Sequence, residues 1–134
     1  KFLKKLHLDY NHGTGHGVGF FLNVHEGPQA ISKSNSVKIQ KGMILSNEPG
    51  YYKKDKFGIR IENLLLVVER GDFLAFETLT CVPYNRKLID LNLLLPSEIK
   101  IIDQYHEWVC RTLSEEVDAL ERDWLVAATA PLED

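Results

Sequence analysis

Three histidines and two glutamates are the side chains of this sequence whose types and spacing could do chemistry. His12 and His16 flank glycine-containing positions, His25 follows nine residues later, and Glu48 and Glu62 come further along in strand-like segments. Imidazole and carboxylate are ligands of borderline-to-hard divalent cations such as manganese, zinc, cobalt or iron. The set therefore indicates a metal site, although a single histidine is more often a surface or packing residue. Spacing alone leaves both interpretations open.

His16 lies in a stretch in which every second residue is glycine, from Gly13 to Gly19, and His12 directly precedes that stretch. Such alternation suits a backbone that passes close to another group in a loop entering a strand. A phosphate-binding loop gains little support, because no Lys-Ser/Thr pair follows and the third glycine is misplaced for a dinucleotide fingerprint.

Glu62 sits in a hydrophobic strand pattern, where an inward carboxylate is costly unless it is paired or metal-bound. Arg60 lies two residues earlier and would share the same face of the strand. A plain surface pair between Arg60 and Glu62 remains the alternative at this point.

The elements that would position these residues come in the order helix end, glycine loop, strands, hairpin. Residues 1–8 predict the last turns of a helix, residues 37–39 a short strand, and residues 43–45 a strand that ends at Pro49 and Gly50. The clearest strand is 58–69, whose apolar run 64–68 indicates burial on both faces. A turn at 70–72 leads into an antiparallel partner, 73–80.

After Pro96 the pattern becomes helical, with Ser97 as the expected N-cap. A second helix over 115–128 would present one apolar face: Val117, Leu120, Trp124 and Leu125. Trp108 and Trp124 are expected to supply core material. The order of strands and then helices predicts an α+β fold, divided into a strand-rich part at 1–95 and a helical segment at 96–134.

Composition limits the class of protein. The 134 residues carry a net charge of −3, and the densest basic cluster, Lys53 to Lys56, is interrupted by Asp55, so nucleic-acid binding gains no support. No apolar run approaches the roughly 18 residues that cross a bilayer. Cys81 and Cys110 are isolated and predict reduced thiols of a cytoplasmic protein, with a disulfide as the lesser alternative. The abrupt opening at Lys1 suggests a fragment.

Five ordered motifs resemble the aminopeptidase P group of the pita-bread metallopeptidase family. They are His12-Gly-Thr-Gly-His16-Gly-Val-Gly19, Asn23-Val-His25-Glu-Gly-Pro28, Gly42-Met-Ile, Asn47-Glu48-Pro-Gly-Tyr-Tyr52 and Gly58-Ile-Arg60-Ile-Glu62-Asn63. The resemblance covers nearly the whole chain and includes the family's 14-residue step from Glu48 to Glu62. It implies the C-terminal portion of a pita-bread fold.

The resemblance implies a ligand set around two divalent cations, most often Mn²⁺. His16, Glu48 and Glu62 match the family's histidine and two glutamate ligands, while His12 and His25 match histidines that contact substrate and move protons. Arg60 matches an arginine that supports this network. The family's two aspartate ligands lie upstream of the histidine motif, and Asp9 does not match them. The isolated chain is therefore expected to be nearly inactive.

The implied reaction is release of the N-terminal residue that precedes proline. Two cations activate a water, the resulting hydroxide attacks the carbonyl before the proline nitrogen, and Glu48 relays the proton while His25 and a metal stabilise the oxyanion. The implied partners are a peptide with proline in second position and a second copy in a homodimer, without nucleic acid or membrane. Open strand edges also predict self-association of the chain. A prolidase acting on Xaa-Pro dipeptides, or a peptide-binding relative without catalysis, are the alternatives.

Overall fold

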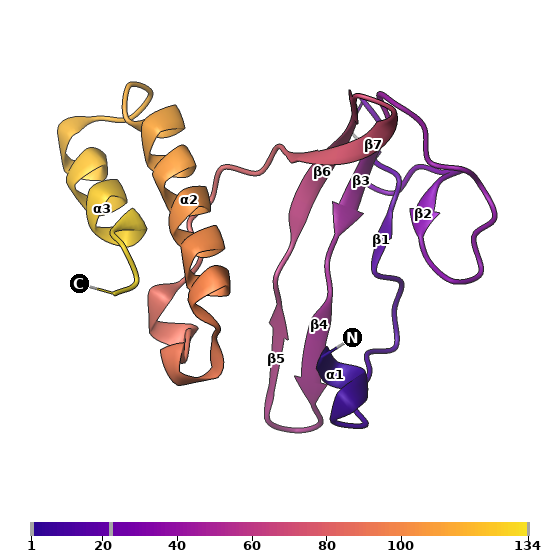
Figure 1. The fold of residues 1–134 in the computed structure, drawn as a ribbon, viewed down its shortest axis with the longest axis horizontal. Helices are drawn as coiled ribbons and strands as arrows, with labels where there is room; N and C mark the ends of the chain where they lie inside the picture. Colours follow the sequence, from indigo (N-terminus) through magenta and orange to yellow (C-terminus); the bar gives the residue numbers. More distant parts are fainter. Residues whose placement is uncertain (1, 22, 134) are drawn as a thin grey trace. The chain divides into compact units, whose positions relative to one another are not determined.

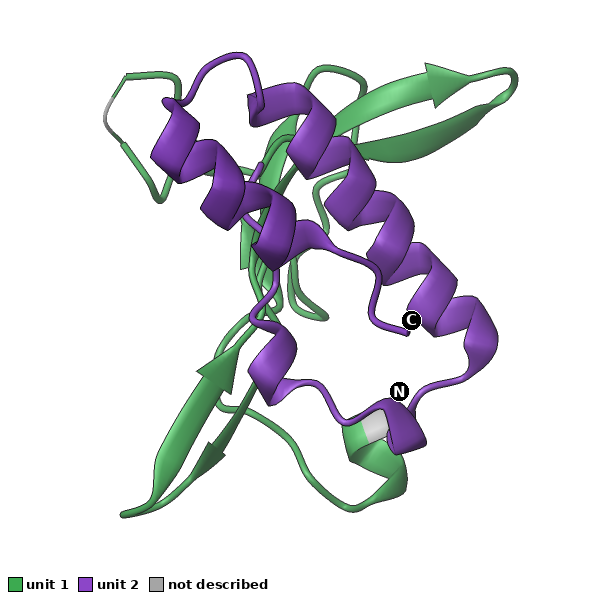
Figure 2. Ribbon diagram, turned by 90° about the vertical axis from the view of Figure 1, so that its left-hand side faces the viewer, with its two compact units in different colours: residues 1–80 green, residues 81–134 purple. Residues whose placement is uncertain are grey.

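The computed structural model describes residues 2–21 and 23–133 and divides into two compact units, Lys1–Thr80 and Cys81–Asp134 (Figure 2). The first unit is built from antiparallel strands and the second from helices (Figure 1). The predicted α+β class is therefore confirmed. Lys1, at the start of the predicted N-terminal helix, lies outside the described residues; the helix that follows it is the short α1, Phe2–Lys5.

A long antiparallel ribbon forms the centre of the first unit. One side is β3 (Ile44–Asn47) followed by β4 (Gly50–Lys53), and the other is β5 (Phe57–Arg60) followed by β6 (Asn63–Arg70). The register is continuous across the middle, because Asn47 pairs with Asn63 and Gly50 pairs with Arg60. The single strand predicted over 58–69 is wrong in this respect: the structure breaks it at residues 61–62, opposite a proline that cannot donate to the ladder.

The hairpin after β6 follows the prediction. β7 (Phe73–Thr78) pairs antiparallel with β6 to give the sheet order β3-β6-β7, and Gly71 in the turn takes φ = 62°, a conformation that glycine adopts without steric cost. The run 64–68 is not buried equally on both faces as expected. Leu65 and Val67 are buried while their neighbours are half-buried, because only one face of this three-stranded sheet packs on the unit's own core.

The glycine stretch enters the sheet edge as predicted. β1 (Gly15–His16) pairs with β2 (Ala30–Ile31), and Gly17 forms an isolated bridge with Leu45 of β3. A Cβ placed on Gly15 would overlap the carbonyl oxygen of Ser46, so this is the close backbone approach that the alternating glycines indicated. The strand predicted over 37–39 is wrong; that segment runs without ladder pairing.

The second unit consists of two short 3₁₀ turns, η1 (Arg86–Leu88) and η2 (Leu91–Leu93), and the helices α2 (Pro96–Leu113) and α3 (Ala119–Thr129). Ser97 is not the cap of α2. The helix begins at Pro96, whose fixed φ suits the first helical position, and the Glu98 carboxylate accepts the Leu95 N–H at 2.9 Å. In the same way α3 begins four residues later than predicted, where Asp118 caps the Glu121 N–H.

The core of the second unit lies between α2 and α3, with Ile99 and Val109 on one helix and Leu125 on the other. The predicted apolar face of the second helix is only partly right. Leu125 is 2% exposed, but Leu120 is 81% and Trp124 63% exposed, because the helix turns Leu125 and Thr129, one turn apart, toward the core. Among residues 2–21 and 23–133, no helix has both the length and the apolar content to span a bilayer.

His106 is the most unusual core residue of this unit. Its side chain is fully buried, its Nε2 accepts the Tyr84 N–H at 3.0 Å, and its Nδ1 has no partner among the described residues. Because Nε2 is an acceptor, the neutral ring carries its proton on Nδ1. Burial lowers the pKa of His106; Asp103 opposes this shift and Arg86 adds to it.

The stability of the second unit should therefore decrease on acidification. The folded unit binds the His106 proton less readily than the unfolded chain, so the free energy of unfolding falls as pH decreases below about 6.5, by up to about 1.4 kcal/mol per pH unit. Both tryptophans of the chain, Trp108 and Trp124, lie in this unit, so urea titrations followed by tryptophan fluorescence report on it directly.

The matched variant for this pH dependence is His106→Gln. The glutamine oxygen can accept the same N–H but does not titrate, and the decrease between pH 7 and pH 5 should become shallower. The control is His7→Asn in the other unit, where φ is 56° and asparagine is tolerated. An unchanged slope in His106→Gln would contradict the assignment.

Candidate metal and catalytic site

The break in the central ribbon places two carboxylates opposite each other. Glu48 follows β3 and Glu62 precedes β6, and the continuous register leaves them as cross-strand partners. Directly opposed residues of an antiparallel pair lie on the same face of the sheet, about 5 Å apart at Cβ. Glu48 is 8% exposed, whereas Glu62 is exposed.

Glu48 is held by three polar partners. Its Oε1 accepts from the Ser46 hydroxyl at 2.9 Å and lies 3.1 Å from Nε2 of His16. Its Oε2 lies 3.4 Å from the guanidinium of Arg60. The Glu48 N–H donates to the carbonyl of Thr14 at 2.7 Å, which ties the carboxylate segment to the histidine loop. Partners on two sides fix the orientation of a nearly buried carboxylate.

The proton arrangement on His16 shows that this pair suits a cation. Nδ1 lies 2.8 Å from the carbonyl oxygen of Gly17, and because a carbonyl only accepts, Nδ1 carries the proton. A neutral ring would then point the lone pair of Nε2 at Oε1 of Glu48, which is repulsive unless a cation lies between them. That cation is either a second ring proton or a metal ion.

The donor set fits a divalent metal. The 3.1 Å between Nε2 of His16 and Oε1 of Glu48 is the separation expected of two ligand atoms that each lie about 2.1 Å from one shared cation. The Gly17 carbonyl behind His16 is the outer partner that metal-binding histidines generally have, since it fixes the tautomer and the ring orientation. This histidine and carboxylate are the first two of the three predicted metal ligands.

The Glu62 carboxylate does not lie close enough to His16 and Glu48 to share a metal ion with them in this conformation. Within the described parts of the chain, no group of three or more His, Cys, Asp or Glu side chains gathers tightly enough to hold a metal ion. Glu62 still influences Arg60, which contacts Glu48. The pKa of Arg60 is raised mainly by its hydrogen bond to Tyr52, and the charges of Glu48 and Glu62 add to this rise. Glu62 as third ligand therefore stays a prediction.

A second hydrogen-bonded chain lies beside this pair and contains His12. Its Nδ1 lies 2.8 Å from the Gly13 carbonyl, so Nε2 is the acceptor and takes the Tyr52 hydroxyl proton at 2.8 Å. The same hydroxyl oxygen accepts Nε–H of Arg60 at 2.9 Å. Arg60 thus connects the His12–Tyr52 pair to Glu48.

His25 packs against the predicted ligand His16. The two ring centroids are 4.2 Å apart with the planes inclined by 39°, and the His25 side chain is exposed. The structure therefore brings His25 to the same place as His16 and leaves it accessible to a bound molecule. All six predicted site residues belong to the first unit.

Two further residues of the site were not among those predicted. Ser46 is fully buried; its oxygen accepts the His16 N–H at 2.9 Å and its proton goes to Glu48. Tyr52 joins His12 to Arg60. The signal for Ser46 was its position two residues before Glu48 on one strand, which gives both side chains the same face. Tyr52 could have been found only through the strand register, since it lies forty residues from His12.

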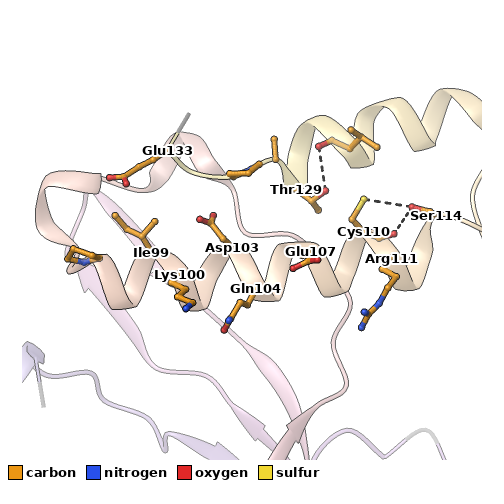
Figure 3. Close-up of a pocket in the computed structure, with 14 residues that line it drawn as sticks. Ile99, Lys100, Asp103, Gln104, Glu107, Cys110, Arg111, Ser114, Thr129 and Glu133 are labelled. Atoms are coloured by element: carbon orange, nitrogen blue, oxygen red, sulfur yellow. Dashed lines mark hydrogen bonds between the residues drawn. The ribbon is translucent and has the colours of Figure 1, made fainter.

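A hollow in the second unit contains none of these residues. It has a volume of about 710 Å³ and lies along α2, the end of α3 and the segment after it (Figure 3). Its lining includes Ile99, Asp103 and Cys110. Cys81 and Cys110 are not joined by a disulfide, in keeping with the prediction of reduced thiols. The candidate chemistry is confined to the strand-rich unit.

Two family models match consecutive parts of the chain. "Metallopeptidase family M24" matches residues 1–69, and "C-terminal region of peptidase_M24" matches residues 72–132. Aminopeptidase P1 of Lotus japonicus is 49% identical over 136 residues, which cover 93% of this chain and 20% of that protein. Xaa-Pro aminopeptidase 1 of Dictyostelium discoideum is 53% identical over 109 residues, covering 75% of this chain and 17% of that protein.

One solved structure shares the fold over almost the whole chain. It is the X-prolyl aminopeptidase of Caenorhabditis elegans, described as a cytosolic enzyme with a di-nuclear active site. It matches with a TM-score of 0.88 at 41% identity, covering 96% of this chain and 22% of that one, which confirms the expected portion of a pita-bread fold. The chain spans about a fifth of the length of these relatives, and it belongs to metallopeptidase family M24.

Proposed function

We propose that this chain supplies the histidine–glutamate part of the active site of a metallo-aminopeptidase that releases the N-terminal residue before proline. The observation that carries the proposal is the His16–Glu48 pair, with Nε2 and Oε1 3.1 Å apart and Nδ1 committed to the Gly17 carbonyl. That proton arrangement calls for a cation. The relatives named Xaa-Pro aminopeptidase, and the one described as di-nuclear, support the choice of reaction.

The proposed ligands from this chain are His16, Glu48 and Glu62, with two aspartates implied by the family resemblance completing a centre for two divalent cations, Mn²⁺ by preference. When bound, such cations activate a water molecule near neutral pH and polarise the carbonyl under attack. Glu62 needs only a small adjustment to take part, because it already lies opposite Glu48 in the ribbon register.

Side chains of the first unit would transfer the proton, stabilise the oxyanion and contact the substrate. Glu48 accepts a proton from the attacking water and relays it, with the Ser46 hydroxyl and Arg60 holding its orientation. His25, accessible beside His16, stabilises negative charge that develops on the substrate carbonyl oxygen. His12 lines the substrate pocket with its acceptor nitrogen held by Tyr52.

We also propose a cytoplasmic location and a homodimer for the whole protein. The location is supported by the relative described as cytosolic. The exposed apolar side chains of β7, Phe73 at 78% and Phe76 at 52% exposure, offer a surface for another chain or segment.

The proposal is tested on the full-length protein that contains this chain. The purified protein should contain close to two divalent metal ions per chain by elemental analysis, lose cleavage of Ala-Pro-Ala on dialysis against EDTA, and regain it with Mn²⁺. Ala-Ala-Ala should not be cleaved. Cleavage confined to the dipeptide Ala-Pro would instead indicate a prolidase. A protein that purifies without metal and gains no activity from Mn²⁺ would overturn the assignment in favour of a peptide-binding role.

A further inference from the structure

A small basic pocket adjoins His12 in the first unit. It has a volume of about 420 Å³, toward the lower end of the range for ligand pockets, so it suits a short segment rather than a long chain. Its lining includes His12 and Thr14, which lie just before β1, together with Lys4, Asp9 and Lys33. The site residues and the pocket therefore share His12.

The two lysines come from distant parts of the sequence. Lys4 is in the last turn of α1, and Lys33 follows β2 (Figure 1). Lys4 lowers the pKa of Lys33, first through a side-chain hydrogen bond that favours the neutral amine of Lys33 and then through charge repulsion, which places the two amino groups close together. Asp9 is the acid that opposes this effect. Two ammonium groups and one carboxylate leave a surplus of positive charge at the pocket.

A surplus of this kind is matched by an anionic group on a bound molecule. His12 lines this pocket and is linked through Tyr52 and Arg60 to Glu48, so a peptide that is cut near His16 and Glu48 can reach the pocket past His12. An extended chain advances about 3.5 Å per residue, so the free carboxylate of a tripeptide lies only about two residue lengths beyond the bond that is cut. Longer peptides would carry their carboxylate past a pocket of this size.

We propose that Lys4 and Lys33 bind the C-terminal carboxylate of short peptide substrates and make the enzyme selective for them. The inference rests on the proposed peptidase function for its substrate, and it adds a specificity site that lies outside the metal ligands. Lys4 and Lys33 are positioned to bind and orient; neither takes part in bond breaking.

The test compares Ala-Pro-Ala with its C-terminal amide on the full-length, metal-loaded protein. The acid should have a KM about fivefold lower at low salt with kcat unchanged, because a solvent-exposed charge pair contributes to binding in the ground and transition states alike. The advantage should shrink in high salt. Lys33→Ala should abolish it, Lys33→Arg should retain it, and Lys54→Ala, in the β4–β5 turn and outside the pocket lining, should leave it unchanged.

A binding measurement separates failure of this site from failure of the peptidase assignment. Isothermal titration with Pro-Ala and Pro-Ala amide should show tighter binding of the acid by wild type and equal binding by Lys33→Ala. If neither tripeptide is cleaved, the peptidase proposal is wrong, and the titration still decides the carboxylate site. Equal KM and equal binding of acid and amide in wild type, or a Lys33→Ala effect of the same size on both, would overturn the carboxylate site.

Discussion

Replacing Glu48 by glutamine should lower kcat of the full-length enzyme about 100- to 10,000-fold, the range that a positioned acid–base group contributes. Glutamine keeps the size of the side chain and can still accept from Ser46. It removes the negative charge that faces Nε2 of His16 at 3.1 Å and the guanidinium of Arg60 at 3.4 Å. Both the affinity for the cation and the ability to take a proton are lost together, so metal content should fall in the same variant.

The matched control is Glu69→Gln. Glu69 forms an ion pair with Lys41 at 2.8 Å, but both side chains are more than half exposed, and such surface pairs contribute little. Steady-state kinetics and elemental analysis of the two variants and wild type, with circular dichroism to check folding, complete the measurement. A folded Glu48→Gln protein that retains a tenth of wild-type kcat would remove Glu48 from its proposed role.

Much of the strand-rich unit follows from local pattern, and its errors have physical causes. The hairpin at Gly71 and the strand before Glu48 are set by turn residues and apolar runs, so they were predictable. The interruption at residues 61–62 was not, because it depends on Pro49 across the ribbon and not on the residues that are interrupted. An apolar run read alone gives no information about its partner strand.

In the helical unit both helices were predicted, but the face that packs was predicted only in part. Helical periodicity located α2 and α3, but it ranked Trp124 and Leu120 with the core although both are largely exposed. Periodicity states which residues share a face, and the face that packs is decided by the neighbour. The buried histidine of α2 illustrates this further: His106 shares a helix face with the buried Ile99 and Val109, but a histidine is not usually ranked with the core, and only the structure shows that its ring accepts the Tyr84 N–H.

In the candidate site, residue types were predictable and connections were not. The pairing of His16 with Glu48 and the opposition of Glu48 and Glu62 are present in the structure. The links that hold them depend on neighbours in space: Ser46 connects Glu48 to the His16 N–H of β1, and Tyr52 connects His12 to Arg60. A hydroxyl in a strand carries no chemical signature until its neighbours across the sheet are known.

The close approach of β1 to β3 makes Gly15 the most sensitive position of the glycine stretch. An alanine Cβ there would overlap the Ser46 carbonyl oxygen and lie 2.8 Å from its carbon, and backbone atoms cannot move aside as a side chain tip can. Gly15→Ala should lower the free energy of unfolding of the first unit by about 3 kcal/mol or more, the upper part of the range for overpacking. Separation of these strands would also break the His16 N–H bond to Ser46 and the Glu48 N–H bond to Thr14.

Gly13→Ala provides a control two residues away. Its added Cβ meets only the Gly15 carbonyl oxygen at 3.8 Å, an ordinary contact, and restriction of the unfolded chain should make this variant neutral or more stable by up to about 1 kcal/mol. Amide hydrogen exchange at Leu45 and Val67, both buried in the strand-rich unit, measures the difference without interference from the helical unit. Equal protection in the two variants would mean that β1 can withdraw from β3 at little cost, and the alternating glycines would then need an explanation other than backbone contact. The expected large difference would instead show that the spacing of glycine around His16 exists to bring its imidazole within reach of Glu48.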